Sequence, residues 1–415
     1  MSNQALPAQI PIPRQPQGPN LATSFWAIYY SLSSLEIDKS RQARNMIGAA
    51  EWHTRSKHIP ALDGVRLLAV ALVMLHHLTR GSQTSIVMHL LGLQVNNGLG
   101  PTLFFVLSGV LLTTVIIDAR GSKHRYRNFL TRRALRILPL YLAYLAVAVV
   151  ATSLLTGRRP QNLWVFASFL QNTFLTAASK TGSVLPMYHL WTLAVQDQFY
   201  ILWPLLLWRC DSVRKMRYLC VAGIILSFGA RMIITHPSLT PELFGRILPA
   251  RAGEMCLGAL LALDLREKTA LSSILRKSLL PLSAILAIWM WHGLSLTTSS
   301  GSVLGLQLIA VTSAALIAVA LKPSTRIARI LGSRFFALGG KKYAFALYIF
   351  HPLMLEICMS LPIASKGLRL TLFAISTVVI SGLSYRYVES YFLHMKVGDR
   401  LQLPSNTPVV LKAAA

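Results

Sequence analysis

The first apolar segment of the chain carries charged and titratable residues at helical spacing. In residues 61–78, ALDGVRLLAVALVMLHHL, a helix would place Asp63, Arg66 and His77 on one face, with His76 pointing about 100° away from His77. Arg66 and His77 would be separated by roughly 16 Å along the helix axis. Because a guanidinium binds phosphate and an imidazole accepts protons, this face predicts a channel with an anion anchor and a general base. The alternative is a packing histidine, with Arg66 reaching the lipid headgroups.

A second group of basic residues lies in RNFLTRRALRILPLY, residues 127–141. Arg132 and Arg136 are four positions apart and Arg133 and Arg136 three apart, so a helix would place them on a shared face. Arginine forks suit phosphate oxygens, which favours a phosphate-binding cluster. The alternative is the basic flank of a membrane helix, with Pro139 near the start of that helix.

Polar residues also interrupt two later apolar segments. In residues 100–112, Ser108 and Gly109 favour a close approach of helix backbones, and Ser108 lacks the context of a GxSxG nucleophile. In residues 189–204, HLWTLAVQDQFYILWP, an interfacial aromatic belt explains Trp191 but not Gln196 and Asp197. Near the end of the chain, polar groups recur at His351, Glu356, Arg386 and Glu389.

The elements that must position these residues are membrane helices. Of the 415 residues, 53% are hydrophobic and only 13% are charged, about half the charged share of an average soluble domain. A membrane-spanning helix needs roughly 20 mostly apolar residues. We therefore predict an all-α integral membrane protein with about ten transmembrane helices, at 61–79, 99–117, 137–156, 191–208, 218–235, 248–265, 279–293, 303–321, 343–362 and 370–388.

The distribution of basic residues predicts the orientation of these helices. If the N-terminus is cytoplasmic, 31 of the 41 Lys and Arg residues fall on the cytoplasmic side and seven on the outer side. Both termini are therefore expected in the cytoplasm, with the chain in the inner (plasma) membrane. This count requires that the apolar stretch 163–178 form an interfacial or re-entrant helix instead of a span. The resulting division is a flexible tail at 1–58, a transmembrane domain at 59–393 and a second tail at 394–415.

The net charge of +27 would suggest nucleic acid in a soluble protein, but its location beside apolar segments indicates contact with membrane lipids. We expect no nucleic-acid partner. The four cysteines, Cys210, Cys220, Cys256 and Cys358, form no CxxC pair, and we interpret them as reduced packing residues. No metal site is expected from their spacing.

Taken together, the motifs resemble the membrane acyltransferase-3 family over about residues 59–393. The family's Asp-Gly-Leu-Arg element, with ten residues between its Arg and a His, corresponds to residues 63–66 and His77. Its FFxLSG element is matched at 104–109, and its RRxxRxxPxY run at 132–141. Its Trp-Ser-Leu-x-Val-Glu-Glu-Gln-Phe-Tyr run corresponds to WTLAVQDQFY, residues 191–200.

This resemblance implies a membrane enzyme that transfers an acyl group, most simply acetyl, from acyl-CoA (acetyl-CoA) to a hydroxyl group. The acceptor would be a carbohydrate, such as an exopolysaccharide, a lipopolysaccharide or a lipid-linked glycan. His77 would be the general base, with Asp63 orienting Arg66, so we expect these three to be the catalytic residues. The donor's phosphates would be held or guided by Arg66, Arg132, Arg133 and Arg136. Further expected site residues are Ser108, Trp191, Gln196, Asp197 and His351.

Several positions depart from the family pattern. Leu67 stands where the family usually has Gly, and Thr192 replaces Ser but keeps a hydroxyl. The first Glu of the family's acidic pair is Gln196 here, which can form hydrogen bonds but cannot act as an acid. Asp197 keeps a carboxylate one position later, about 100° away on a helix.

The alternative function is a transporter of a glycan or another small molecule, since membrane helices with a few buried charges would suit either class. The spacing of Arg66 and His77, together with the arginines at 132–136, favours the enzyme.

Overall fold

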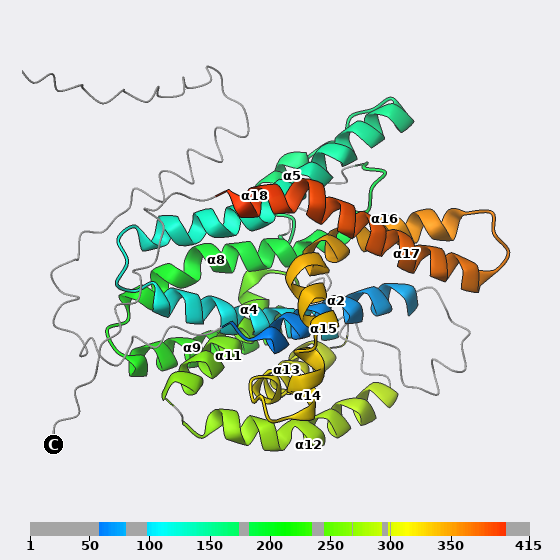
Figure 1. Cartoon of the computed structure of the whole chain (residues 1–415). Helices are drawn as coiled ribbons and strands as arrows, with labels where there is room; N and C mark the ends of the chain where they lie inside the picture. The colour runs from blue at the N-terminus through cyan, green and yellow to red at the C-terminus, as the bar shows by residue number, and fades with distance from the viewer. Residues whose placement is uncertain are drawn as a thin grey trace, which may run out of the picture. The chain divides into compact units, whose positions relative to one another are not determined.

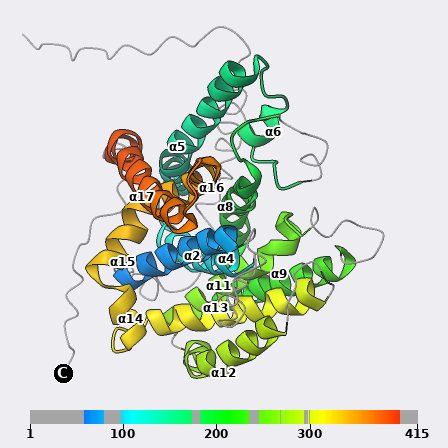
Figure 2. The same cartoon turned by 90° about the vertical axis from the view of Figure 1, so that its right-hand side faces the viewer.

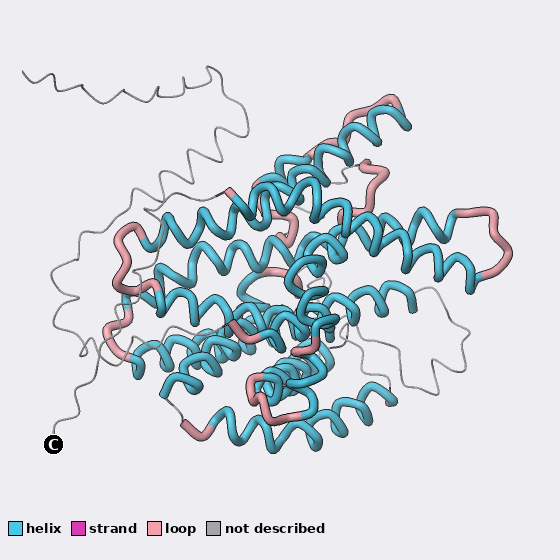
Figure 3. The backbone as a smooth tube through the Cα atoms, viewed as in Figure 1, coloured by secondary structure: helices cyan, strands magenta, loops and turns pink. Residues whose placement is uncertain are grey.

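The computed structural model describes residues 58–79, 98–173, 182–234, 245–267, 269–292, 298 and 300–395. Within this described part every regular element is a helix and none is a strand, as predicted (Figures 1 and 3). The helices are α2 (Pro60–Thr79), α4 (Leu99–Asp118), α5 (Arg125–Thr156), α6 (Leu163–Ala167), η2 (Tyr188–Leu190), α8 (Trp191–Arg209), α9 (Val213–Ile234), α11 (Leu248–Glu267), α12 (Leu271–Trp291), η3 (Gly301–Gly305), α13 (Leu306–Ala320), α14 (Arg326–Leu331), α15 (Arg334–Leu338), η4 (Gly339–Tyr343), α16 (Ala344–Ser360), α17 (Lys366–Ser384), η5 (Tyr385–Glu389) and α18 (Ser390–His394). The predicted tails lie almost entirely outside the described residues.

Eight helices of the described part are long and apolar enough to cross a membrane: α2, α4, α5, α9, α12, η3–α13, α15–α16 and α17–α18. A helix satisfies its own backbone hydrogen bonds, which a segment in lipid requires. The predicted spans 191–208 and 248–265 are also helical, as α8 and α11, but are not among the eight. Helix α8 is continuous, but polar residues at 196–198 interrupt its apolar sequence. Helix α11 carries the charged residues Arg251, Glu254 and Asp264. The count of ten and the orientation of the termini remain predictions.

Pro139 lies in the interior of α5, so the prediction that a helix starts near it was wrong. The arginine-rich segment forms the first turns of the same helix of 32 residues. Proline removes one backbone hydrogen bond, but membrane helices tolerate it where neighbouring groups satisfy the backbone. The three arginines are therefore carried by the helix that continues as an apolar span.

The helix predicted over 163–178 is much shorter than expected. Helix α6 ends at Ala167, and Phe169 adopts a left-handed backbone conformation with φ 56°, which stops the helix. Gln171 and Asn172 are buried against protein instead of facing an interface, and the amides of Asn172 and Gln198 exchange hydrogen bonds of 3.1 and 2.7 Å. Residues 174–181 lie outside the described part.

Helices α2, α4 and α8 lie between two groups of helices, α5 with α16 and α17 on one side and α9 with α11–α13 on the other (Figures 1 and 2). Burial follows this arrangement. The buried share of the most apolar 18-residue stretch is 72% in α4, against 17% in α12 and 22% in α17–α18. The outer helices expose large apolar side chains, such as Leu280 and Val378, as expected of surfaces that face lipid.

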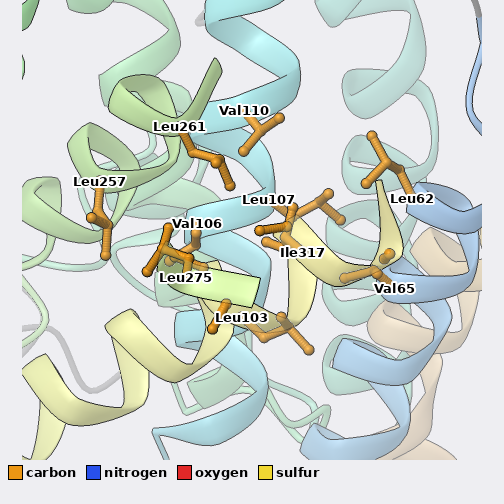
Figure 4. Close-up of a cluster of buried hydrophobic side chains, with 14 of the residues drawn as sticks. Leu62, Val65, Leu103, Val106, Leu107, Val110, Leu257, Leu261, Leu275 and Ile317 are labelled. Carbon is orange, nitrogen blue, oxygen red and sulfur yellow. The ribbon is translucent and has the colours of Figure 1, made fainter. Parts of the chain in front are cut away.

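A hydrophobic core joins α2, α4, α11, α12 and α13. Figure 4 shows Leu62 and Val65 of α2 beside the α4 side chains, with Leu257, Leu261, Leu275 and Ile317 completing the cluster. Because lipid is as apolar as leucine, helices in membranes associate through close packing more than through the hydrophobic effect.

Two glycines permit the closest backbone contacts around the core. A Cβ atom on Gly109 would lie 1.9 Å from the carbonyl oxygen of Met255, which agrees with the predicted close approach at Ser108-Gly109. A Cβ atom on Gly340 would lie 1.7 Å from the carbonyl oxygen of Asp63. The second contact fixes the first turns of α2, where the charged residues begin, against η4.

Candidate active site

A narrow cavity of about 70 Å³ lies between α2, α4, α5, α8 and α16. One face of α2 lines it with Arg66, Val70 and Val73. His77 lies on the same face, one turn beyond Val73. We call this face of α2, from Arg66 to His77, the α2 stripe. The polar lining residues are Arg66, Ser108, Arg133, Arg136, Thr192, Gln196, Tyr200 and Tyr348.

Three guanidinium groups converge on one end of this cavity. Arg66 is paired with Asp63 at 2.7 Å, and the second Asp63 oxygen lies 2.7 Å from Nε2 of His58. Arg133 stacks on the Tyr200 ring at 4.9 Å, and Arg136 interacts electrostatically with the buried Glu389 of η5. The guanidiniums of Arg66, Arg133 and Arg136 also repel one another. The guanidiniums line the cavity whereas their carboxylate partners do not, so a ligand in the cavity meets cations, which suits an anion.

Arg132 differs from the other predicted phosphate-binding residues. It is exposed and is not among the residues that line this cavity. Arg133 and Arg136 share the inward face of α5 because they are three positions apart. The structure thus brings three of the four predicted arginines together.

Gln196 occupies the cavity wall close to the arginines. Its side-chain amide donates to the hydroxyl oxygens of Ser108, at 2.5 Å, and Tyr200. Ser108 and Gln196 are both buried, and both line the cavity. The two predicted site residues, 88 positions apart in the chain, therefore form one polar group.

Asp197 and Trp191 lie outside the cavity lining. Asp197 points away from Gln196, and within the described part its Oδ2 is buried without a hydrogen-bond partner. Trp191 lies between two guanidiniums, with Arg246 at 5.8 Å and Arg251 at 5.6 Å from its ring centre. Neither residue lines the cavity, although Asp197 interacts electrostatically with Arg133 from outside it.

The other end of the α2 stripe is a histidine pair. Nδ1 of His77 lies 2.8 Å from Nε2 of His351, and the two rings lie edge to edge in nearly one plane, with centroids 5.0 Å apart. His351 is completely buried, whereas His77 is partly exposed and has the edge of Tyr188 at 5.5 Å. His76 points to another side of α2, with its ring 5.4 Å from that of His77.

Further rings surround this pair and connect it to the cavity. The hydroxyls of Tyr348 and Thr192 are hydrogen-bonded, and both residues line the cavity. The Tyr348 hydroxyl also donates to the carbonyl oxygen of His189, whose ring lies 5.6 Å from His351. Although three histidines lie close together, the described residues contain no group of three or more His, Cys, Asp or Glu suited to hold a metal ion.

A separate buried ion cluster joins α9 and α11. Glu254 lies 3.2 Å from Arg251 and 3.7 Å from Arg231, and all three side chains are buried. Arg231 also donates to Gln307, and Arg251 to Thr102. These contacts compensate the two arginines within apolar segments, and the cluster lies outside the cavity.

Sequence reasoning missed Tyr200 and Tyr348 as site residues. Tyr200 follows Gln196 by four positions, and Tyr348 precedes His351 by three, so helical spacing could have placed each beside its partner. The contacts between His77 and His351, 274 positions apart, had no such local signal.

With this geometry in view, the chain can be compared with known proteins. A family model of the acyltransferase-3 group, described as an acyltransferase domain, matches residues 59–386. The chain belongs to this family. The match begins one residue before α2 and ends in η5, and it therefore contains every residue of the cavity and of the histidine pair.

Relatives in bacteria are similar over most of this chain. It is 26% identical over 390 residues to a putative O-acetyltransferase of Staphylococcus aureus (strain COL), covering 87% of this chain and 62% of the relative. It is 28% identical to the putative peptidoglycan O-acetyltransferase YrhL of Bacillus subtilis, with coverages of 80% and 54%. For the peptidoglycan O-acetyltransferase OatA of Listeria monocytogenes the identity is 24%, with coverages of 80% and 56%. The chain thus spans between about half and three fifths of the length of these relatives. No solved structure matches it.

Proposed function

We propose that this chain is a membrane-embedded O-acyltransferase that transfers an acyl group, most simply acetyl, from acyl-CoA to a hydroxyl of a carbohydrate. The observation that carries the proposal is the convergence of Arg66, Arg133 and Arg136 on one cavity, with His77 one turn beyond its last α2 residues on the same helix face. Membership of the acyltransferase family and the names of the relatives support the reaction class.

The arginine end fits the phosphates of the donor. Guanidinium forks bind phosphate oxygens bidentately, and three such groups close together are stabilised when an anion lies between them. The cavity beyond them is lined mostly by apolar side chains, which suits the thioester arm and acyl group of the donor. The roughly 16 Å along α2 from Arg66 to His77 is of the order of the length of that extended arm. If the predicted orientation is correct, the donor enters from the cytoplasm.

The reaction requires a base beside the acceptor hydroxyl, and we assign this role to His77. The hydroxyl proton passes to the imidazole while the acceptor oxygen bonds to the thioester carbonyl carbon. The carbon–sulfur bond then breaks, and the proton returns from His77 to the sulfur, so that an ester and free CoA result. The amide of Gln196 and the hydroxyls of Ser108 and Tyr200 hold the intervening cavity wall in place.

The acceptor class follows from the relatives, two of which carry names that refer to peptidoglycan. We propose a glycan acceptor that reaches His77 from the side of Tyr188, the partly exposed ring at the far end of the stripe. The exposed apolar helices support a reaction within a membrane, and we propose the plasma membrane.

An assay with the full chain in proteoliposomes tests this function. Acetyl-CoA labelled in the acetyl group is supplied together with soluble peptidoglycan fragments, and both free CoA and labelled glycan are measured. We expect CoA release that depends on the acceptor and matches the label gained by the glycan. A transporter would instead move glycan without consuming acetyl-CoA, and that result would overturn the proposal.

A further inference from the structure

The two nitrogens of His77 are not equivalent, and the hydrogen bonds around His351 determine which one carries hydrogen. This inference rests on the proposed function, in which His77 is the base. An uncharged imidazole has one N–H donor and one acceptor nitrogen, and only the acceptor nitrogen can take a proton. The hydrogen-bond partners therefore decide which nitrogen is available.

The tautomer of His351 is determined by two backbone carbonyl groups. Its Nδ1 lies 2.8 Å from the carbonyl oxygen of Tyr348 and 3.2 Å from that of Leu347. A carbonyl oxygen only accepts hydrogen bonds, so Nδ1 of His351 must carry the hydrogen. His351 is completely buried, and burial penalises a charged ring. Its Nε2 is then an acceptor.

The tautomer of His77 is determined in turn by His351. Its Nδ1 lies 2.8 Å from Nε2 of His351, so Nδ1 of His77 donates and its own hydrogen is fixed there. We propose that His351 is a positioning residue, which holds His77 with hydrogen on Nδ1 and a lone pair on Nε2. Nε2 is then the atom that takes the proton of the acceptor hydroxyl.

The same contact also stabilises the charged ring during the reaction. When Nε2 of His77 gains a proton, its Nδ1–H becomes a charge-assisted donor to His351. His351 does not take this proton, because its ring is completely buried and burial penalises the charged form. The hydrogen bond between the rings thus orients the base in a manner similar to the orienting residue of a catalytic triad, with an uncharged partner in place of a carboxylate.

The surroundings keep His351 in this arrangement. Ring neighbours of the pair are His76, Tyr188, His189 and Tyr348. The Tyr348 hydroxyl donates to the carbonyl oxygen of His189, so this donor is directed away from the pair. The two rings lie nearly in one plane, tilted by only 14°, as expected when Nδ1–H of His77 points along the lone pair on Nε2 of His351.

Two substitutions of His351 separate positioning from packing. The amide of His351→Gln reaches the place of Nε2 and can accept from His77, whereas that of His351→Asn reaches only the place of Nδ1. We expect His351→Gln to keep kcat within about tenfold of wild type and His351→Asn to lose about 100-fold, with the KM for acetyl-CoA unchanged in both. A matched control is His394→Asn, because His394 forms the same type of bond to a carbonyl four residues back on an exposed helix end. Equal kcat values for His351→Gln and His351→Asn would overturn the proposal.

A spectroscopic measurement gives the tautomer without any assay of activity. The full chain in detergent is labelled with ¹⁵N-histidine, and the His77 signals are assigned by their loss in His77→Gln. We expect His77 to carry hydrogen on Nδ1 and none on Nε2 in the wild type and in His351→Gln. In His351→Asn we expect this preference to be lost. Hydrogen on Nε2 in the wild type would contradict the inference. If the tautomer is as expected but acceptor-dependent transfer is absent, the proposed function fails and the positioning contact stands.

Discussion

At the scale of single residues, Gln196 is the position where this chain departs most clearly from the pattern of its family. The family's carboxylate is replaced by an amide that donates to Ser108 and Tyr200. Both partners are hydroxyls, which can turn and donate when they face an acceptor. We therefore expect that the site needs a hydrogen-bonding group at this position and does not depend on a charge.

Substitutions of Gln196 test this hydrogen-bonding role. Gln196→Leu leaves the buried hydroxyls of Ser108 and Tyr200 without their partner. The transition state should then lose about 2 kcal/mol of stabilisation, which lowers kcat/KM roughly 30-fold. Gln196→Glu should be near neutral or harmful, because a carboxylate at membrane depth costs on the order of 3 kcal/mol unless it is paired. Both are measured as acceptor-dependent CoA release. A several-fold rise in turnover for Gln196→Glu would show that the lost charge mattered.

The arginines of α5 offer a second residue-scale prediction. Arg136→Gln removes a charge-assisted hydrogen-bond donor from the cavity and should raise the KM for acetyl-CoA about tenfold, with a smaller change in kcat. Arg132→Gln is the matched control on the same helix, and its effect should be smaller because Arg132 is exposed outside the cavity. Equal effects of the two substitutions would mean that the net charge of the helix matters more than the cavity.

At the scale of elements, the contact between α2 and η4 fixes the beginning of the site. Gly340 lies against the carbonyl oxygen of Asp63, and Asp63 in turn holds Arg66. A side chain at position 340 would push the first turn of α2 away from η4. The cavity would then lose the position of one of its three guanidiniums.

Gly340→Ala should therefore reduce both stability and activity. Inserting a methyl group into such a tight contact costs about 1–3 kcal/mol, which should appear as a lower thermal unfolding temperature in detergent and a higher KM for acetyl-CoA. The control is Gly382→Ala on α17, where an added Cβ meets no atom within 4 Å. That substitution should be neutral or slightly stabilising, since alanine favours helices. An undisturbed Gly340→Ala variant would indicate that α2 can shift without harm.

The helices were the most predictable part of the structure, because long apolar segments have few folded forms in a membrane. The shared face of Arg133 and Arg136 followed from helical spacing for the same reason. Contacts across the bundle did not follow: His77 meets His351, and Gln196 meets Ser108, through helix packing that no local pattern encodes. Pro139 and the short α6 were predicted wrongly because tertiary contacts, not local preferences, decide whether a proline or a polar amide is tolerated.

At the scale of the whole molecule, the number of spans determines which loops meet the acceptor. Eight helices satisfy the length and hydropathy expected of spans, whereas the predicted ten also include α8 and α11. Both counts are even and keep the termini on one side. They differ in the side on which the basic residues 214–217 lie, and a cytoplasmic position is favoured for such a cluster.

Reporter fusions distinguish the two counts. With ten spans, fusions after residues 235 and 295 should read as external, and fusions after 212 and 272 as internal. With eight spans, in which α8 and α11 do not cross, 212 becomes external and 235 internal. An external reading at 212 would therefore contradict the ten-span topology, although the fusion at 295 would remain external.

The central claim is that the two ends of the α2 stripe perform separate tasks, donor binding at Arg66 and proton transfer at His77. The most direct test is the steady-state rate of acceptor-dependent CoA release by wild type, His77→Ala and His76→Phe in the same membranes. We predict that His77→Ala lowers kcat at least about 100-fold while the KM for acetyl-CoA is unchanged, and that His76→Phe keeps wild-type values. Full activity in His77→Ala, or an equal loss in both variants, would contradict the assignment of His77 as the base.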